Sequence, residues 1–303
     1  MPAPPSRRTT ILVITAAVLT VGVGVGATSL LATLAPTGQP SSVAEKPEAP
    51  IETPPTRIAI AGDTGTGTPA QFATAEQMRL QSKHDPYDGL LLLGDLIYDT
   101  GDAALVEERI TTPFAPITST GARLLPALGN HDYQDGEQNQ ILEALNRDKS
   151  WYAEMVGSVK VIVLDSNQVE NNEQRQWLRK VLSQPTPAGT WTIVAMHHPA
   201  YSAGAHGSDL VVRETWSPLF AEFEVPLVLA GHDHDYQRSL PQDGVTYIVS
   251  GGGATLRPTG EEDFTAVSIS TLHYLDLHAD DKKLVGRAID PEGATIDTFT
   301  INR

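Results

Sequence analysis

The sequence contains no cysteine among its 303 residues. Disulfide bonds and thiolate metal sites are therefore excluded, so any metal ion must be held by oxygen and nitrogen ligands. Basic residues are also scarce, because 21 lysines and arginines stand against 37 aspartates and glutamates and leave a formal net charge of −16. Such an acidic surface repels nucleic acid, and we expect no nucleic-acid-binding surface.

One long apolar run, residues 9–35, carries no charged residue. Because a membrane-spanning helix needs about 20 apolar residues, residues 1–35 predict an N-terminal membrane anchor, with a signal peptide as the alternative. Arg7 and Arg8 should remain in the cytoplasm, which makes the rest of the chain extracytoplasmic, either membrane-anchored or secreted. An extracytoplasmic protein without cysteine also points to a bacterial source.

The remainder of the chain divides into a linker and one large domain. Residues 36–56 are rich in proline, serine and glutamate, and this composition predicts a disordered linker. Residues 57–303 are long enough for one substantial core. We therefore expect a single functional domain over residues 57–303.

Short apolar runs in this domain stop at Asp, Asn or His; they are residues 57–63, 89–95, 123–132, 159–166, 190–198 and 225–234. Continuous apolar runs predict strands covered on both faces. Residues 69–83 and 172–184 predict helices between them, with Pro69 in a first turn and Asn172 as an N-cap. This alternation predicts an α/β fold. The tail, residues 245–253, 266–280, 283–289 and 294–301, predicts antiparallel strands that complete a second sheet.

The polar residues at the ends of the apolar runs predict a shared site. In open α/β sheets, functional residues collect outside the carboxyl ends of the strands. The residues at such ends are Asp63, Asp95, Asn130, His131, His197, His232 and His234, and Tyr98 follows Asp95 closely. A single cation would not use so many donors. Two cations about 3.5–4 Å apart that share one carboxylate would use nearly all of them.

The ordered motifs 62-GDTG-65, 94-GDLIY-98, 129-GNHD-132, 195-AMHHP-199 and 231-GHDH-234 resemble the five sequence blocks of the purple acid phosphatases. These enzymes belong to the calcineurin-like metallophosphoesterase superfamily, and the resemblance covers about residues 57–238. It implies a four-layer α/β/β/α sandwich with two mixed sheets, of the small single-domain type. It also implies an acid phosphatase that hydrolyses small phosphate monoesters with a metal-bound hydroxide.

The resemblance implies a ligand set for a dinuclear metal centre. The first ion would be held by Asp63, Asp95, Tyr98 and His234; the second would be held by the bridging Asp95 together with Asn130, His197 and His232. Most superfamily members carry a ligand histidine where this chain has Gly65, and the Tyr98 phenolate would replace it. Because a phenolate is a hard anionic donor, the swap implies Fe(III) beside a divalent Fe, Zn or Mn ion.

Two further histidines would contact the substrate by the same resemblance. His131 would contact the phosphoryl oxygens and protonate the leaving alkoxide, while Asp132 either tunes its basicity or is a solvated turn residue. His206, nine residues after His197, would contact the substrate, or else is an exposed loop residue. His198 is expected to point to the opposite side from His197.

Two other functions stay open at the level of sequence. The first is a phosphodiesterase of the same superfamily that acts on nucleotides or lipid head groups. The second is a binding protein that has lost catalysis on this fold. The filled set of ligand positions argues against the binding protein, and the phosphomonoesterase is the preferred hypothesis.

Overall fold

The computed structural model describes residues 55–303. The predicted anchor at residues 1–35 and nearly all of the predicted linker lie outside the described residues. Within residues 55–303, no helix combines the length and the apolar character that crossing a membrane requires.

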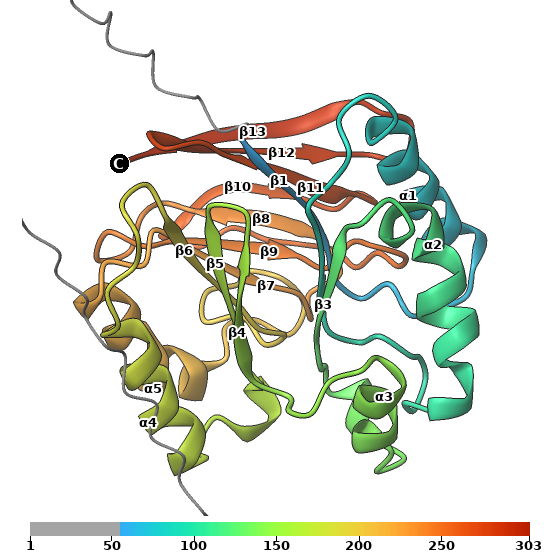
Figure 1. Ribbon diagram of the computed structural model, residues 1–303, viewed down its shortest axis with the longest axis horizontal. Helices are drawn as coiled ribbons and strands as arrows, with labels where there is room; N and C mark the ends of the chain where they lie inside the picture. The colour runs from blue at the N-terminus through green and yellow to red at the C-terminus, as the bar shows by residue number, and fades with distance from the viewer. Residues whose placement is uncertain (1–54) are drawn as a thin grey trace, which may run out of the picture. The chain divides into compact units, whose positions relative to one another are not determined.

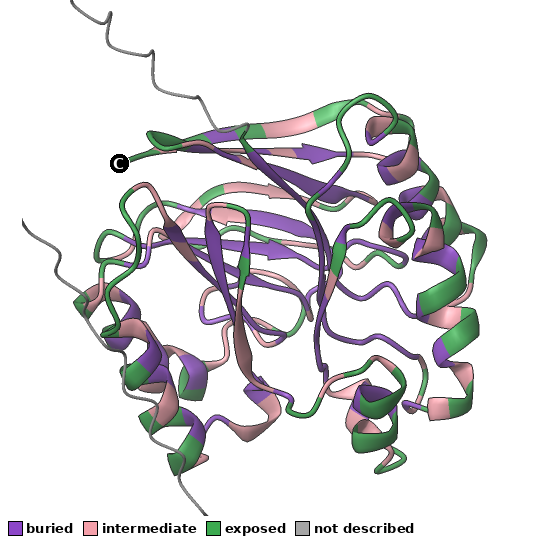
Figure 2. Cartoon of the chain, in the orientation of Figure 1, coloured by how far each residue is buried: buried purple, intermediate pink, exposed green. Residues whose placement is uncertain are grey.

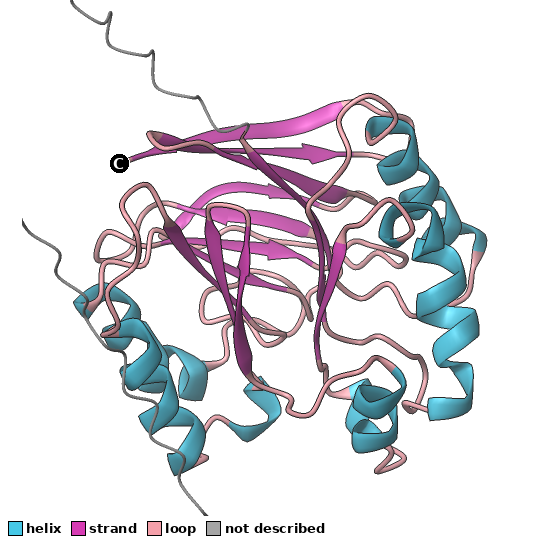
Figure 3. Ribbon diagram, in the orientation of Figure 1, coloured by secondary structure: helices cyan, strands magenta, loops and turns pink. Residues whose placement is uncertain are grey.

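Two mixed sheets pack face to face, and helices cover their outer faces (Figures 1 and 3). The six-stranded sheet has the order β13 (Thr295–Asn302), β12 (Lys283–Ile289), β11 (Tyr274–Ala279), β1 (Thr56–Ala61), β2 (Gly89–Leu93), β3 (Arg123–Ala127). The seven-stranded sheet has the order β10 (Thr265–Ile269), β8 (Tyr236–Ser239), β9 (Thr246–Ser250), β7 (Leu227–Ala230), β6 (Trp191–Ala195), β5 (Val159–Val163), β4 (Tyr152–Val156).

Helices form the two outer layers. The six-stranded sheet is covered by α1 (Pro69–Gln81), α2 (Thr112–Thr118) and α3 (Gln138–Ala144), and the seven-stranded sheet by α4 (Asn172–Leu182) and α5 (Leu210–Glu222). Short helical turns complete the elements: η1 (Ala103–Leu105), η2 (Glu107–Thr111), η3 (His131–Tyr133) and η4 (Ser166–Gln168). The structure therefore has the expected four-layer α/β/β/α arrangement.

The central strands are buried on both faces, as their continuous apolar runs predicted (Figure 2). In β1, Ile58 and Ile60 pack into the core between the sheets, whereas Ala59 and Ala61 pack against the helices of the outer layer. Burying an isoleucine side chain stabilises the fold by about 1.5–3 kcal/mol. These rigid strands position the loops at their carboxyl ends.

The tail of the chain departs from the prediction. β9 and β10 join the seven-stranded sheet, whereas β11, β12 and β13 join the six-stranded sheet beside β1. In addition, β9 runs parallel to β7. The expectation that all tail strands pair antiparallel in one second sheet is therefore wrong, because an apolar pattern gives no information on which sheet edge a strand joins.

The predicted helices begin close to the expected positions. Pro69 opens α1, where its missing N–H costs no helical hydrogen bond. The N-cap of α4 is Asn171 and not Asn172, because the Asn171 side chain accepts from the amide of Glu173 at 2.9 Å. Both Asn residues offer the same capping chemistry, so the sequence alone could not separate them.

Candidate metal centre

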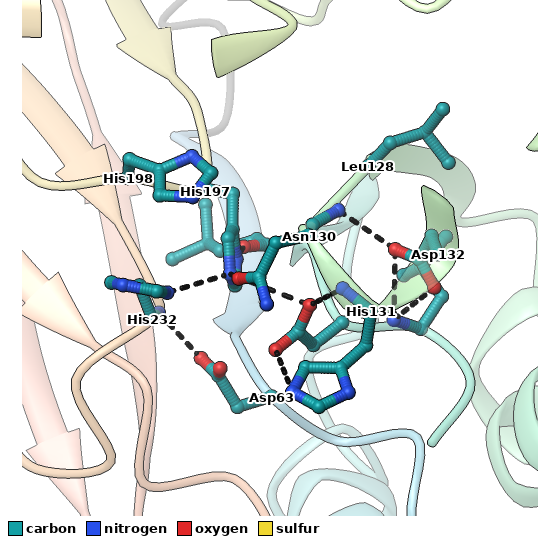
Figure 4. Close-up of polar contacts among 12 residues, drawn as sticks. Asp63, Leu128, Asn130, His131, Asp132, His197, His198 and His232 are labelled. Carbon is teal, nitrogen blue, oxygen red and sulfur yellow. Dashed lines mark hydrogen bonds and ion pairs between the residues drawn. The ribbon is translucent and has the colours of Figure 1, made fainter. Parts of the chain in front are cut away.

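The predicted site residues meet where the carboxyl ends of strands from both sheets come together, and Figure 4 labels five of them: Asp63, Asn130, His131, His197 and His232. Asp63, Asp95 and Asn130 follow β1, β2 and β3, which run parallel in the six-stranded sheet. His197 and His232 follow β6 and β7, which run parallel in the seven-stranded sheet. The carboxyl ends of parallel strands lie at the same end of a sheet. Both sheets therefore direct polar side chains into the same space.

Ligand candidates occupy a rarely populated backbone conformation directly after these strands. Asp63, Asp95 and His232 have φ values of 58°, 50° and 74°. Non-glycine residues in the left-handed region carry a conformational cost, and such positions cluster at functional sites. The sharp turn directs each side chain across the edge of the sheet instead of along it.

Glycines before these residues leave room for the ligand candidates. Gly94 has a φ of 90°, and a Cβ there would lie 2.5 Å from the His197 ring. A Cβ at Gly129 would meet the Asp95 carboxylate. These two glycines are therefore required by the packing of their neighbours in the site.

A first group of donors surrounds the Tyr98 hydroxyl. This oxygen lies 3.1 Å from Asp63 Oδ1, 2.8 Å from Asp95 Oδ2 and 3.1 Å from His234 Nε2. One hydroxyl proton satisfies only one of these three acceptors. The remaining lone pairs face each other, and Asp63, Asp95 and His234 present ligand atoms within 4.8 Å of one another. This donor set fits a cation.

A second group of donors surrounds His197. Its Nδ1–H donates to the carbonyl oxygen of Leu93 at 2.8 Å, so Nε2 carries the lone pair. That nitrogen lies 3.0 Å from Asn130 Oδ1, 3.2 Å from His232 Nδ1 and 3.4 Å from Asp95 Oδ1. Lone pairs converge here as well, and Asp95 faces both groups through its two oxygens. The arrangement fits two cations with one shared carboxylate.

Burial sets the charges of these groups. Burial raises the pKa of Asp63 well above its usual value, and the Asp95 carboxylate raises it further. Burial opposes the charge of Asp95 too, but His197 and the amide of His131 lower its pKa overall. Burial and the two carboxylates raise the pKa of the Tyr98 phenol. Burial lowers the pKa of His232 to about 2, so its imidazole stays neutral and able to bind a cation.

His131 lies at the open side of the first group, as expected. Its side chain is 26% exposed, and its Nε2 lies 4.0 Å from Asp95 Oδ2. Nδ1 donates to the carbonyl oxygen of Asp99 at 2.5 Å, which directs Nε2 toward the site. A ring nitrogen held in this way can donate a proton to a group bound between the two donor groups.

His206 also lies in the site, on the side of the second group. Its ring centroid lies 4.3 Å from that of His232. The buried Asp233 accepts from the His206 amide at 2.8 Å and from its Nδ1 at 3.2 Å. Asp233 therefore points away from the donor groups, as expected, and holds His206 in place.

The prediction for His198 is wrong. It does not point away from His197; a ring nitrogen of His198 lies within 4.8 Å of those of His197 and His232. The Ser166 hydroxyl contacts His198 Nδ1 at 2.8 Å and accepts from the His198 amide at 2.9 Å. The side-chain alternation of a strand does not apply, because β6 ends at Ala195.

Asp132 fills neither of its two expected roles. It is fully buried, and its oxygens accept from the amides of Leu96 at 2.9 Å, Ile97 at 3.0 Å and Gly129 at 2.7 Å. These bonds join the loop after β2 to the loop after β3. Asp132 thereby fixes the two loops that carry Asp95, Tyr98 and Asn130.

Comparison with known proteins agrees with this geometry. The family model of the calcineurin-like phosphoesterases matches residues 56–236. The chain belongs to the calcineurin-like phosphoesterase family.

Named relatives of this phosphoesterase include acid phosphatases. Human tartrate-resistant acid phosphatase type 5 is 27% identical over 248 residues, which cover 68% of this chain and 75% of the relative. An uncharacterized Mycobacterium tuberculosis protein is 30% identical over 228 residues, which cover 56% of this chain. The match spans only 42% of the mycobacterial protein. The phosphoesterase is thus similar to purple acid phosphatases and to a longer bacterial protein.

Solved structures share the fold of this phosphoesterase. Purple acid phosphatase PPD1 from yellow lupin superposes with a TM-score of 0.73 at 22% identity, covering 82% of this chain and 54% of the lupin chain. GAP50, the anchor in the inner membrane complex of Plasmodium, also gives a TM-score of 0.73, at 18% identity over 82% of this chain and 89% of its own. At these identities the likeness establishes the fold.

Several residues of this site were not predicted from the sequence. Ser166, which contacts His198, and Arg257, which contacts His206 at 2.6 Å, received no role, and Asp132 received the wrong ones. Arg257 follows β9, which runs parallel to β7, so the rule that function collects at carboxyl ends applies to this strand too. That rule could have identified Arg257 only if the sequence had revealed the parallel pairing of β9, which an apolar pattern does not do. The partners of Asp132 are backbone amides, which leave no signal in the sequence.

Proposed function

We propose that this phosphoesterase hydrolyses phosphate monoesters at a dinuclear metal centre. The observation that carries the proposal is the convergence of two groups of lone pairs on the two oxygens of Asp95. Asp63, Asp95, Tyr98 and His234 would hold the first cation. Asp95, Asn130, His197 and His232 would hold the second.

The donor chemistry supports Fe(III) at the first position and a divalent ion at the second. The first group offers two carboxylates, one phenol and one imidazole, and hard anionic oxygens favour a trivalent cation. The second group offers imidazoles, an amide oxygen and the shared carboxylate. When bound, the cation pair would polarise the phosphoryl group and supply a water-derived nucleophile near neutral pH.

The residues of the chain complete the reaction. His131 Nε2 faces the space between the donor groups, so it would give its proton to the ester oxygen as the P–O bond breaks. Water supplies the new P–O bond on the opposite side of phosphorus. His206 would position the phosphoryl oxygens from the side of His232. The substrate would be a small phosphate ester, hydrolysed outside the cytoplasm if residues 9–35 anchor or export the domain.

A noncatalytic function has one specific observation in its favour. The Plasmodium structure with the same fold is described as an anchor in a membrane complex. The complete donor set of this chain argues for catalysis, because a binding protein would not need to keep the buried Asp63 and Asp95 so close together.

The decisive experiment is an ester hydrolysis assay on the full-length chain, with bound metals quantified. We expect turnover of p-nitrophenyl phosphate well above turnover of bis(p-nitrophenyl) phosphate. Turnover of the bis-ester alone would identify a phosphodiesterase. Metal-free protein without turnover of either ester would identify the noncatalytic alternative.

A further inference from the structure

Arg257 lies beside the candidate metal centre, and no carboxylate of residues 55–303 pairs with it. Within residues 55–303, its guanidinium forms no ion pair, whereas Arg147 and Arg238 each reach an acidic side chain. Its only side-chain hydrogen bond in this range joins Nη1 to His206 Nε2 at 2.6 Å. An arginine that pairs with none of the many carboxylates in the described part of the chain has N–H donors available for an anionic ligand.

The backbone holds Arg257 in place. Its amide donates to the carbonyl oxygen of His234 at 3.0 Å, and its carbonyl oxygen accepts from Ser270 Oγ at 2.7 Å. A β-bridge between Gly204 and Thr259 joins its loop to the loop that carries His206. The backbone of Arg257 is therefore held in place before any ligand binds, which lowers the entropic cost of binding.

A chain of hydrogen bonds runs from Asp233 through His206 to Arg257. Asp233 accepts from Nδ1 of His206, so the other ring nitrogen accepts from the guanidinium. The His206 side chain is 37% exposed, whereas Asp63 and His197 are fully buried. Through its contact with His206, Arg257 thus lies on the solvent side of the metal ligands, beside the place where the proposed substrate's phosphoryl group would bind.

We propose that Arg257 binds a second phosphate group of the substrate, next to the phosphoryl group that reacts. The planar guanidinium matches two phosphate oxygens at once, and one contact to His206 leaves most of its N–H groups available. The enzyme would then favour substrates with adjacent phosphates, such as inorganic pyrophosphate and nucleoside diphosphates. In that reaction water bonds to the terminal phosphorus, the P–O–P bond breaks, and the departing phosphate stays paired with Arg257. This inference rests on the proposed function.

The test compares two substrates in variants of the full-length chain. Arg257→Met should lower kcat/KM for pyrophosphate at least tenfold more than kcat/KM for p-nitrophenyl phosphate. Arg257→Lys keeps the charge but loses the planar group that binds two oxygens at once. It should therefore show a ratio of kcat/KM for pyrophosphate to kcat/KM for p-nitrophenyl phosphate between those of Arg257→Met and the wild type. Arg179→Met removes the same charge from the outer face of α4 and should leave the ratio within twofold. The proposal would be overturned if the ratio of the two kcat/KM values in Arg257→Met stayed within twofold of the wild-type ratio.

A binding measurement separates this inference from the proposed function. Failure of the wild-type chain to hydrolyse p-nitrophenyl phosphate would remove the proposed function without testing Arg257. Calorimetry with pyrophosphate on the full-length wild-type and Arg257→Met chains would then decide the point. Binding weakened at least tenfold in the variant supports the anion-binding role, and unchanged binding excludes it.

Discussion

The amide of Tyr98 donates to the carbonyl oxygen of Gly65 at 2.9 Å. A Cβ at Gly65 would collide with the carbonyl group of Leu96 and would lie 2.5 Å from the Ile97 amide nitrogen. The position that carries a ligand histidine in most superfamily members therefore has no room for any side chain here. This contact holds the backbone of Tyr98 against Gly65, while the Tyr98 hydroxyl joins the first donor group.

The Tyr98→Phe variant tests the phenol as an iron ligand. We expect loss of the visible absorption that a tyrosinate bound to Fe(III) produces, together with weaker iron retention. Tyr133→Phe is the matched control, because that hydroxyl bonds Asp165 and not the donor groups. Metal analysis and an absorption spectrum check both variants, and an unchanged Tyr98→Phe spectrum would reject this ligand.

Asp95→Ala should remove both metal ions, because each donor group depends on one oxygen of this carboxylate. Turnover of p-nitrophenyl phosphate should fall to background. The control is Asp102→Ala, which removes an exposed carboxylate at the start of η1. Elemental analysis after gel filtration measures the ions per chain; two ions retained by Asp95→Ala would contradict the shared ligand.

His131→Ala should lower kcat by about 10²-fold while the metal content stays unchanged, since a general acid contributes about 10²–10⁴-fold to a rate. The loss should be larger for β-glycerophosphate than for p-nitrophenyl phosphate, because an alkoxide needs a proton more than p-nitrophenolate does. The exposed His84 serves as the control when changed to Ala. An equal loss on both substrates, or a loss of metal, would argue against proton donation by His131.

The fold could be predicted where one physical signal dominated. The buried runs of β1 and β2 predicted strands, and the residues after them predicted the donor groups. β4 was missed because this edge strand is only half-buried, and β8 because its sequence is polar although it is largely buried. α5 was missed because Pro218 and an irregular apolar pattern hide its helical period.

The site could be predicted as a set of residues but not in its supporting contacts. The motifs placed His232 and His234 at the end of β7, but they do not show which way each ring points. His232 has a positive φ, and the two rings join different donor groups. The supports of the ligands, such as the carbonyl of Leu93 for His197, come from backbone atoms that no residue pattern reveals.

Asp132→Asn should destabilise the chain by about 1–3 kcal/mol, because an amide nitrogen would face backbone N–H groups that need an acceptor. The loops of Asp95 and Asn130 would loosen, and metal affinity should fall by about 10–100-fold, as for other supports of metal ligands. Denaturant unfolding and metal titration measure the two effects. Asp135→Asn, at an exposed carboxylate that bonds Thr100, should change neither. Wild-type stability in Asp132→Asn would mean that the three amides have other partners.

His273 should make the stability of the fold depend on pH. It is fully buried, its Nδ1 donates to the Thr271 carbonyl oxygen at 2.9 Å, and its Nε2 accepts from Ser250 Oγ at 2.9 Å. Burial lowers the pKa of His273 to about 4, although the Thr271 carbonyl raises it. The unfolded chain, with a histidine pKa of about 6.5, therefore binds a proton first as the pH falls.

The contribution of His273 is complete above about pH 6.5 and is lost as the pH falls toward 4, because protons bind preferentially to the unfolded chain in that window. This linkage should lower the free energy of unfolding by about 2 kcal/mol between pH 7.5 and pH 5. His273→Gln keeps one donor and one acceptor but does not titrate. Its free energy of unfolding should therefore fall by about 2 kcal/mol less than that of the wild type between pH 7.5 and pH 5. Denaturant unfolding of both chains at the two pH values measures the difference. Equal losses would show that His273 is accessible to protons in the folded state, and the low-pH sensitivity of the fold would then have to come from its buried carboxylates.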